Sequence, residues 1–520
     1  MALPSPIPPA STAPQASAGR AAFSLRAAAL VITVALVVAA QMAFARTEYW
    51  SAGWRLALAV LASGVLWQWR LPITDWTQAS GRLWGLAPQL WRRVVGALAV
   101  LVGMGLWVEG TWRFCQGWAA NFERAWLTWF AAAAIMSLGF RILQAPRAPA
   151  RNRLSRWEWA ALAIAFAVAV GFRLANIQNY PPHDGVSQVE ELQGGQFGTH
   201  FLMGDRTRWE FVGPAVLHAL GIWIGGPTLL ATRAASAVFA FLRVLPAYFV
   251  FRALAGPAGA MVGTALLAVS GWDTIVSRCS GHPDLLLTLC CFALILGPAV
   301  RGSWAVYPWI GLMTGYATTT YIAYRPLVGF AIAGVFVANL ARPYSRRLTT
   351  WLRVLVPPVL VTALAVAMFI PLFYRLPGPG QFTNEYLNGW NRAHAIEGYY
   401  GPTDTWSQAL QKRWQRTVQT ANLYYTQGDS NALHNAGGRP LIDPTTGGLM
   451  LVGFGYTLVT CLRGFYGVVL ALFAITFLGT MVATGNFDVL RAQAVMTYVY
   501  ALAGIGAGGI YAAAGRSFGL

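Results

Sequence analysis

Residues 157–177 read WEWAALAIAFAVAVGFRLANI and run directly into QNYPPHDGVSQVEE (178–191). The first stretch is long enough to cross the ~30 Å hydrocarbon core of a bilayer as one helix. The second gathers two prolines, a histidine and three acids, although the 520-residue chain has only 18 Asp and Glu in all. An apolar helix that opens into an acidic loop indicates a membrane helix with a polar chamber at its far end.

The composition of the whole chain agrees with a membrane location. Hydrophobic residues make up 56% of the sequence and charged residues 11%, whereas a soluble domain carries about 25% charged residues. Apolar runs of spanning length recur, and they predict an all-α polytopic membrane protein with about fourteen transmembrane helices. The predicted spans are 27–45, 54–69, 93–111, 125–142, 157–177, 230–253, 257–276, 284–300, 304–322, 325–341, 351–373, 448–463, 465–484 and 491–512.

Arginine-rich loops predict the orientation of these spans. With a cytoplasmic N-terminus, the arginines within 70–93, 141–156 and 342–347 all fall inside, as the positive-inside rule requires. This holds only if FVGPAVLHALGIWIGG (211–226) lies flat on the outer surface as an interfacial helix. Its length of ~16 residues and the proline within it favour that placement. The first run, 27–45, is interpreted as an anchoring helix rather than a cleaved signal peptide, because a polytopic chain needs no separate signal.

In this topology most acids lie on the outer side of the membrane, in two large outer loops at 178–229 and 374–447. The cytoplasmic loops are nearly free of acids. The sequence therefore predicts a multi-pass membrane protein with an acid-bearing chamber on its outer, periplasmic-type face, and that face is the predicted place of any active site.

Three acids of the first outer loop are candidates for proton transfer. A carboxylate at the membrane surface can act as a general base toward a hydroxyl group, and Asp184 follows a stiff Pro-Pro pair. The alternative role for Asp184 is to cap a short helix that begins near Gly185. Glu190 and Glu191 are adjacent, so on a helix they point about 100° apart.

Four further residues are placed near the outer boundary by the predicted spans. Asp284 is expected to begin the helix that follows Gly-His-Pro, and Arg278 either binds a ligand or extends toward the lipid headgroups. Arg325, with Tyr321 nearby, either holds a phosphate through its guanidinium or anchors the helix as part of an aromatic belt.

Several other classes of site are disfavoured by the sequence. The net charge of +19 comes almost wholly from arginine, but it forms no basic stripe with interleaved aromatics, so nucleic acid is not an expected partner. Gly504, Gly506 and Gly509 match G-x-G-x-x-G inside an apolar span, which favours close helix packing over nucleotide binding. The five cysteines lack metal spacing, and Cys290 and Cys291 are expected to pack inside a helix. The histidines lack zinc spacing, so no metal ligands are predicted and no cofactor is required, although a divalent cation held by carboxylates is compatible with the sequence.

Five stretches resemble the integral-membrane glycosyltransferases of the GT-C superfamily, in its protein-mannosyltransferase-like and aminoarabinose-transferase-like branch. The resemblance covers about 157–512, and it depends on the order of the motifs together with the predicted topology. The stretches are FRLANIQNYPPHD (172–184), GPTLLATRAASAVFAFLRVLPAYFVFRAL (226–254), VSRCSGHPDLLLTL (276–289), GLMTGYATTTYIAYRPL (311–327) and GDSNALHNAGGRPLIDPTTGGLMLVG (428–453).

The chain divides into three predicted parts, of which only the last carries the resemblance. Residues 1–20, rich in Pro, Ala and Ser, are expected to be a disordered tail, and residues 21–150 are expected to be a four-helix membrane extension. For 151–520 the resemblance implies a GT-C-type bundle, the glycosyltransferase membrane domain, whose outer loops carry interfacial helices. The implied reaction moves a sugar from a polyprenyl-phosphate donor to a hydroxyl of a glycan, lipid or protein acceptor, with inversion.

The resemblance also implies roles for individual residues. Asp184 would be the base, Arg325 and Arg278 would stabilise the departing lipid phosphate, and Asp284 would orient a substrate. The late outer loop adds Asp429 and His434 as substrate-binding candidates.

One departure from the family pattern leaves alternatives open. The family commonly has adjacent acids in the first loop, whereas Asp184 is followed by Gly185. Glu190 or Glu191 would then be the base, or the protein would be a catalytically inactive scaffold. A transporter or flippase of lipid-linked sugars is the other alternative, but it would usually show inverted repeats and acids near mid-membrane.

Overall fold

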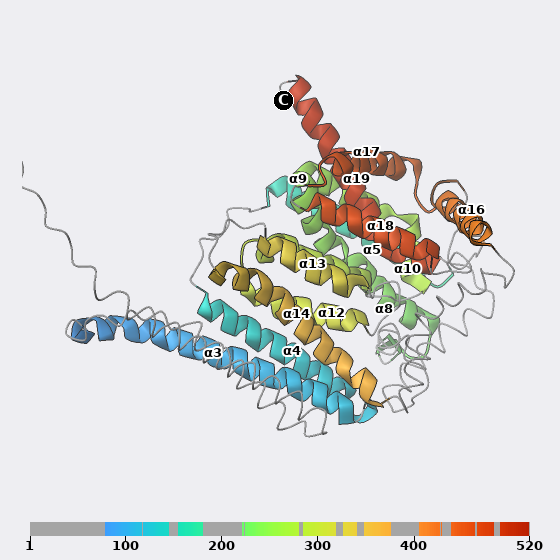
Figure 1. The fold of residues 1–520 in the computed structure, drawn as a ribbon. Helices are drawn as coiled ribbons and strands as arrows, with labels where there is room; N and C mark the ends of the chain where they lie inside the picture. The colour runs from blue at the N-terminus through green and yellow to red at the C-terminus, as the bar shows by residue number, and fades with distance from the viewer. Residues whose placement is uncertain are drawn as a thin grey trace, which may run out of the picture.

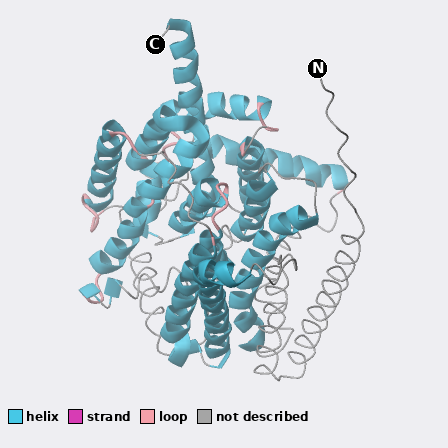
Figure 2. Ribbon diagram, turned by 90° about the vertical axis from the view of Figure 1, so that its left-hand side faces the viewer, coloured by secondary structure: helices cyan, strands magenta, loops and turns pink. Residues whose placement is uncertain are grey.

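The fold is an assembly of α-helices, seen in a computed structural model (Figure 1). The structure describes residues 79–116, 118–144, 154–179, 221–222, 224–279, 284–318, 326–340, 348–375, 405–426, 428, 438–462, 465–482 and 489–518. None of these described residues forms a strand (Figure 2). The helices are α3 (Ala79–Gln116), α4 (Trp118–Leu143), α5 (Arg156–Leu174), α8 (Leu229–Leu242), α9 (Val244–Val269), α10 (Gly271–Cys279), α11 (Asp284–Leu294, extended by a π-helical turn Ile295–Ala299), a 3-10 turn (Trp304–Val306), α12 (Tyr307–Thr318), α13 (Pro326–Leu340), α14 (Leu348–Arg375), α16 (Trp406–Tyr425), α17 (Pro444–Val459), α18 (Tyr466–Val482) and α19 (Val489–Phe518).

Within the described residues, 6 helical stretches are long and apolar enough to cross a membrane, which indicates a multi-pass membrane protein. Three shorter apolar helices accompany them. The predicted spans 27–45 and 54–69, the tail 1–20, and most of the predicted interfacial helix 211–226 lie outside the described residues. The six stretches are Leu90–Cys115, Arg124–Leu143, Arg156–Leu174, Leu229–Val269, Trp351–Met368 and Ala492–Gly515.

The stretch Leu229–Val269 is a helical hairpin rather than one straight helix. Gly256 has φ 73° and ψ −178° and precedes Pro257, so the helical path breaks there. A Cβ atom on Gly263 would lie 3.1 Å from the side chain of Phe251. A straight helix would separate these two residues by about 18 Å, so α9 folds back on itself, as the separate predicted spans 230–253 and 257–276 require.

The second of those predicted spans is wrong at its end, because the helix breaks at Ser270. That residue has φ −56° and ψ 119° and ends α9, and α10 starts at Gly271. The Ser270 hydroxyl accepts a hydrogen bond from the backbone N–H of Asp273 at 3.0 Å. A serine that satisfies the first N–H groups of a new helix is a typical N-cap, and it overrides the continuous apolar pattern.

Aromatic contacts show that α4 and α12 run in opposite directions. The rings of Trp126 and Tyr316 lie 5.2 Å apart, and those of Phe140 and Trp304 lie 5.9 Å apart. The start of α4 therefore meets the end of α12, and the two helices are antiparallel. The predicted spans 125–142 and 304–322 have opposite directions in the predicted topology, in agreement with this packing.

Glycines bring α9, α17 and α19 into backbone contact. A Cβ on Gly259 would lie 2.4 Å from the carbonyl oxygen of Gly504, and a Cβ on Gly506 would lie 2.1 Å from that of Leu449. Such distances leave no room for a side chain, so the prediction that Gly504 and Gly506 serve close packing is confirmed. Gly509 has nothing within 4 Å of an added Cβ and takes no part in the seam.

The two long segments predicted as outer loops depart from one end of the bundle. Arg233 near the start of α8 donates to the carbonyl oxygen of Ile177 just after α5, so residues 178–229 leave and return there. Tyr424 at the end of α16 packs on Trp272 of α10, with ring centroids 5.8 Å apart. We call this the arginine end, after the buried arginines described below.

The end of α14 also points toward the arginine end. The chain turns between α11, which begins at Asp284 beside α10, and α12, so α12 returns toward that end. A Cβ on Gly311 would contact Leu364, and a Cβ on Gly315 would contact Met368, so α14 runs parallel to α12.

Candidate functional site

A buried carboxylate lies between two arginines at the arginine end. Asp273 of α10 pairs with Arg173 of α5 and with Arg243, whose Nη1 lies 2.8 Å from Asp273 Oδ1. The relative exposures of these side chains are 0% for Asp273, 0% for Arg173 and 4% for Arg243. Because the three residues come from different parts of the sequence, this cluster joins α5, the α8–α9 junction and α10.

Helix ends supply the remaining partners of the cluster. Arg173 donates from Nη1 to the carbonyl oxygen of Ala268 at 3.0 Å and from Nη2 to that of Leu267 at 3.2 Å. The last carbonyls of a helix lack intrahelical partners and carry partial negative charge, so they stabilise a buried guanidinium. The hydroxyl of Tyr500 donates to Ser270 Oγ at 2.6 Å, which ties α19 to the same corner.

Two more buried arginines hold the end of α5. Arg278 donates from Nη2 to the carbonyl oxygens of Phe172 and Ala175, and it is 4% exposed. Arg233 donates to the carbonyl oxygen of Ile177 at 2.9 Å and is 1% exposed. Between these contacts Asn176 adopts the left-handed conformation with φ 54°, a common way for a chain to leave a helix. The start of the segment that bears Asp184 is therefore fixed by arginines from α8 and α10.

The opposite end of α5 has its own ion pair. Glu158 is 5% exposed, accepts from Tyr248 Oη at 2.7 Å, and pairs with Arg252 Nε at 2.5 Å. Its carboxylate also accepts from the backbone N–H of Ser155, which completes a capping box at the start of the helix. Helix α5 is thus clamped to α9 at both ends.

Of the nine predicted site residues, the structure describes the side chain of one, Arg278. That side chain turns inward to the end of α5, so it does not extend toward lipid headgroups as one interpretation expected. Asp284 begins α11, as predicted, although its side chain lies outside the described part. The other seven also lie outside the described residues: Asp184, Glu190, Glu191, Tyr321, Arg325, Asp429 and His434.

The sequence analysis missed Asp273, Arg173 and Arg243. The available signal was the presence of ionisable residues within apolar runs, because such residues are costly in a membrane and usually have a specific partner. Arg173 lies in VGFRLA and Arg243 in AFLRVL. Their partner could not be identified without the packing, since it lies 100 residues from Arg173 in the sequence.

The buried cluster at the arginine end carries net positive charge. Both oxygens of the Asp273 carboxylate are engaged by guanidinium groups, so Asp273 serves here as the partner that holds the two arginines together. Four arginines and one aspartate come together among the described residues, which favours negative charge near the exit of α5. The described residues contain no group of His, Cys, Asp and Glu that could hold a metal ion.

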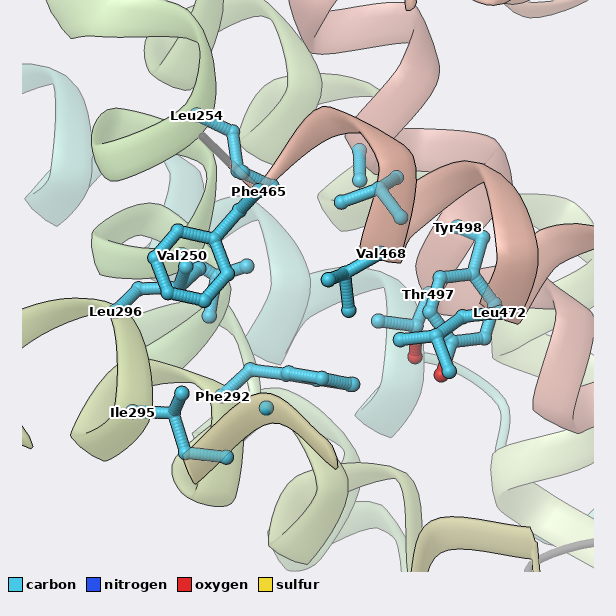
Figure 3. Close-up of a pocket in the computed structure, with 13 residues that line it drawn as sticks. Val250, Leu254, Phe292, Ile295, Leu296, Phe465, Val468, Leu472, Thr497 and Tyr498 are labelled. Carbon is cyan, nitrogen blue, oxygen red and sulfur yellow. The ribbon is translucent and has the colours of Figure 1, made fainter. Parts of the chain in front are cut away.

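A small apolar pocket lies among the helices of the same bundle (Figure 3). Its cavity volume is about 20 Å³, and it lies between α9, α11, α13, α18 and α19. Phe292, Val468 and Leu472 are among the side chains around it, and Thr497 contributes a buried hydroxyl that has no hydrogen-bond partner. A cavity of this size has room for about one water molecule, and its apolar lining offers that water few hydrogen-bond partners.

Comparisons with known proteins add no relative: no protein-family model, no curated protein and no solved structure matches this chain. The resemblance to GT-C glycosyltransferases therefore depends on the sequence motifs and their order.

Proposed function

We propose that this protein is a membrane glycosyltransferase that moves a sugar from a polyprenyl-phosphate donor to an acceptor hydroxyl on the outer face of the membrane. The observation that carries the proposal is the convergence at the arginine end. Segments 178–229 and 374–447, which hold most of the acids, depart from the same end of the bundle as the buried arginines. A sugar transfer of this kind needs a carboxylate as its base and cations for the phosphate of the donor, both at one membrane surface.

In the proposed reaction, Asp184 takes the proton from the acceptor hydroxyl. The acceptor oxygen forms a bond to the anomeric carbon from the face opposite the phosphate, while the bond between that carbon and the phosphate oxygen breaks. The electron pair leaves with the polyprenyl phosphate, and its growing charge is stabilised by Arg325 and by the positive field of the arginine end. The anomeric configuration inverts.

One feature of the described residues supports the proposed site. Arg233 and Arg278 bind the backbone of the last residues before the first acidic segment, so the segment that bears Asp184 begins at a fixed position. In addition, the sequence has no P-loop or dinucleotide motif, in keeping with a sugar that arrives already activated on a lipid.

The test is a transfer assay with the full-length protein in proteoliposomes. A panel of radiolabelled polyprenyl-phosphate sugars is offered together with a membrane extract as the source of acceptors, and release of polyprenyl phosphate is measured. Asp184→Asn keeps the shape of the side chain but cannot accept the proton, so turnover should fall by about 10²-fold or more.

Asp443→Asn is the matched control. Asp443 caps α17 by accepting from the backbone N–H of Thr446 at 2.9 Å, and asparagine caps a helix about as well. Activity should therefore stay at the wild-type level. The proposal fails if folded protein releases polyprenyl phosphate from none of the donors. If Asp184→Asn is active but Glu190→Gln or Glu191→Gln is not, the base lies later in the loop.

A further inference from the structure

Five exposed arginines lie at the end of the bundle where α12 and α14 begin, opposite the arginine end, and we call them the basic rim. Arg92, Arg141 and Arg353 each lie two residues from an end of an apolar stretch long enough to span a membrane. Arg93 follows Arg92 on α3, and Arg301 lies in the turn between α11 and α12. No acidic side chain in the described part of the chain pairs with any of the five.

Contacts between α3, α4 and the turn before α12 bring the basic rim together. A Cβ on Gly96, one turn after the rim arginines of α3, would lie 2.8 Å from the side chain of Leu143 at the end of α4. Gln144, the next residue, donates to the carbonyl oxygen of Gly302 at 2.8 Å, so the end of α4 is bonded to the turn that holds Arg301. These three segments therefore meet at one corner of the bundle.

Helix α14 brings Arg353 to the same corner, because α14 packs on α3 (Figure 1). The indole N–H of Trp107 in α3 donates to the carbonyl oxygen of Leu364 in α14 at 3.1 Å. Arg93 precedes Trp107 by 14 positions and Arg353 precedes Leu364 by 11, so at ~1.5 Å per residue the two arginines lie within about 5 Å of the same height. Packed helices are about 8–10 Å apart, so arginine side chains from neighbouring helices can reach one bound group.

Exposed apolar side chains adjoin the basic rim on α3, α4 and α14. Trp91, Leu138, Trp351 and Leu355 each lie within one turn of a rim arginine and are between 45% and 68% exposed. Tryptophan beside basic residues is typical of the boundary between acyl chains and headgroups. A soluble anion would contact the arginines alone, whereas a phospholipid also covers the apolar side chains next to them.

We propose that the basic rim binds the phosphate headgroup of an anionic phospholipid, whose acyl chains lie along the apolar sides of α3, α4 and α14. Guanidinium groups bind phosphate oxygens through paired N–H donors. In the predicted topology this end faces the cytoplasmic leaflet, where anionic lipids attract basic residues. Orientation of the helices requires only that arginines lie on one side, whereas the packing gathers five of them at one corner. The inference does not depend on the proposed sugar transfer.

Native mass spectrometry of the full-length protein in a mild detergent tests the proposal. Phosphatidylglycerol and phosphatidylcholine are titrated separately, and the dissociation constant of the first bound lipid is measured for each. The rim variant combines Arg141→Gln with Arg301→Gln. The matched control combines Arg124→Gln with Arg156→Gln, which removes two exposed charges outside the rim, at the other end of α4 and at the start of α5.

The wild type should bind phosphatidylglycerol more tightly than phosphatidylcholine. Each basic residue near an anionic headgroup contributes about fivefold in affinity, so the rim variant should bind phosphatidylglycerol about 25-fold more weakly. The control should change this affinity by less than about threefold, because isolated exposed charges contribute little. A second rim variant, Arg93→Gln with Arg353→Gln, changes the same surface through α3 and α14 and should show a loss of similar size.

Equal affinity of the wild type for the two lipids would overturn the proposal. Equal losses in the rim and control variants would also overturn it, since the lipid would then respond to total charge and not to this corner. Inorganic phosphate in large excess is the competitor that separates a lipid from a soluble anion. Phosphatidylglycerol should stay bound, and its displacement by phosphate would show that the rim is not a lipid site.

Discussion

Replacing Asp273 by asparagine should destabilise the bundle more than any other single change from acid to amide among the described residues. The carboxylate is fully buried, and Arg243 Nη1 lies 2.8 Å from Oδ1. At that distance and an effective dielectric constant of ~20, the attraction for one arginine is about 6 kcal/mol. Desolvation of the charges offsets much of this gain, and removal of one partner from a buried ion pair costs about 3–5 kcal/mol.

The lower part of that range applies to Asp273→Asn. Arg173 retains its hydrogen bonds to the carbonyl oxygens of Leu267 and Ala268, and asparagine still offers one oxygen, so we expect a loss of about 3 kcal/mol. The free energy of unfolding is measured by titrating purified protein in mixed micelles with dodecyl sulfate and following tryptophan fluorescence. The control, Asp443→Asn, should change it by less than about 0.5 kcal/mol.

A double-mutant cycle distinguishes buried charge from simple loss of a contact. If unpaired charge causes the loss, Arg243→Met should cost less in the Asp273→Asn background than in the wild type, because the second change removes a guanidinium that has lost its partner. A free energy of unfolding within about 0.5 kcal/mol of the wild type for Asp273→Asn would refute the reasoning, since the pair would then contribute nothing measurable.

Three other predictions follow from the described contacts. A Cβ on Gly453 would lie 1.8 Å from the carbonyl oxygen of Leu502, so Gly453→Ala should lower the free energy of unfolding by about 1–3 kcal/mol. Gly455 has nothing within 4 Å of an added Cβ, so Gly455→Ala should raise the free energy of unfolding by up to about 1 kcal/mol. Dodecyl sulfate titration measures both variants, and equal effects would contradict the packing argument. Glu158→Gln keeps an acceptor for Tyr248 but leaves Arg252 without its carboxylate, so the same titration should show a loss of about 1–2 kcal/mol, smaller than that of Asp273→Asn because Arg252 is partly exposed; a larger loss would reverse this ranking. The predicted topology places Asn179 and Leu462, two exposed positions, on opposite sides of the membrane. When each is replaced by a single cysteine and intact cells are treated with an impermeant thiol reagent, only the cysteine at Asn179 should be labelled. Labelling at Leu462 alone would show that the bundle has the opposite orientation in the membrane.

Much of the helical framework follows from the sequence, because a membrane span is a local property. Twenty apolar residues in a row must satisfy their own backbone hydrogen bonds in a bilayer, and only a helix does so. The runs 157–177 and 351–373 accordingly correspond to α5 and α14, and Asp284 begins α11 as its position after Gly-His-Pro predicts. The close helix packing at Gly504 and Gly506 also follows from the sequence, because glycines inside an apolar span allow the backbones of two helices to approach each other.

Only the tertiary structure decided how the buried charges pair. The residues of FRLANI and GWDTIV that meet at Asp273 are far apart in sequence, and hydropathy assigns each the same cost wherever it lies. Which guanidinium reaches which carboxylate depends on helix directions and crossing points. Those directions are determined by contacts such as the Gly256 reversal and the close approach of α9 to α19. The break at Ser270 has both a local and a tertiary cause. Ser270 and Asp273 form the local Ser-x-x-Asp pattern that caps a new helix, whereas the bond from the Tyr500 hydroxyl to Ser270 Oγ exists only because α19 packs against the end of α9.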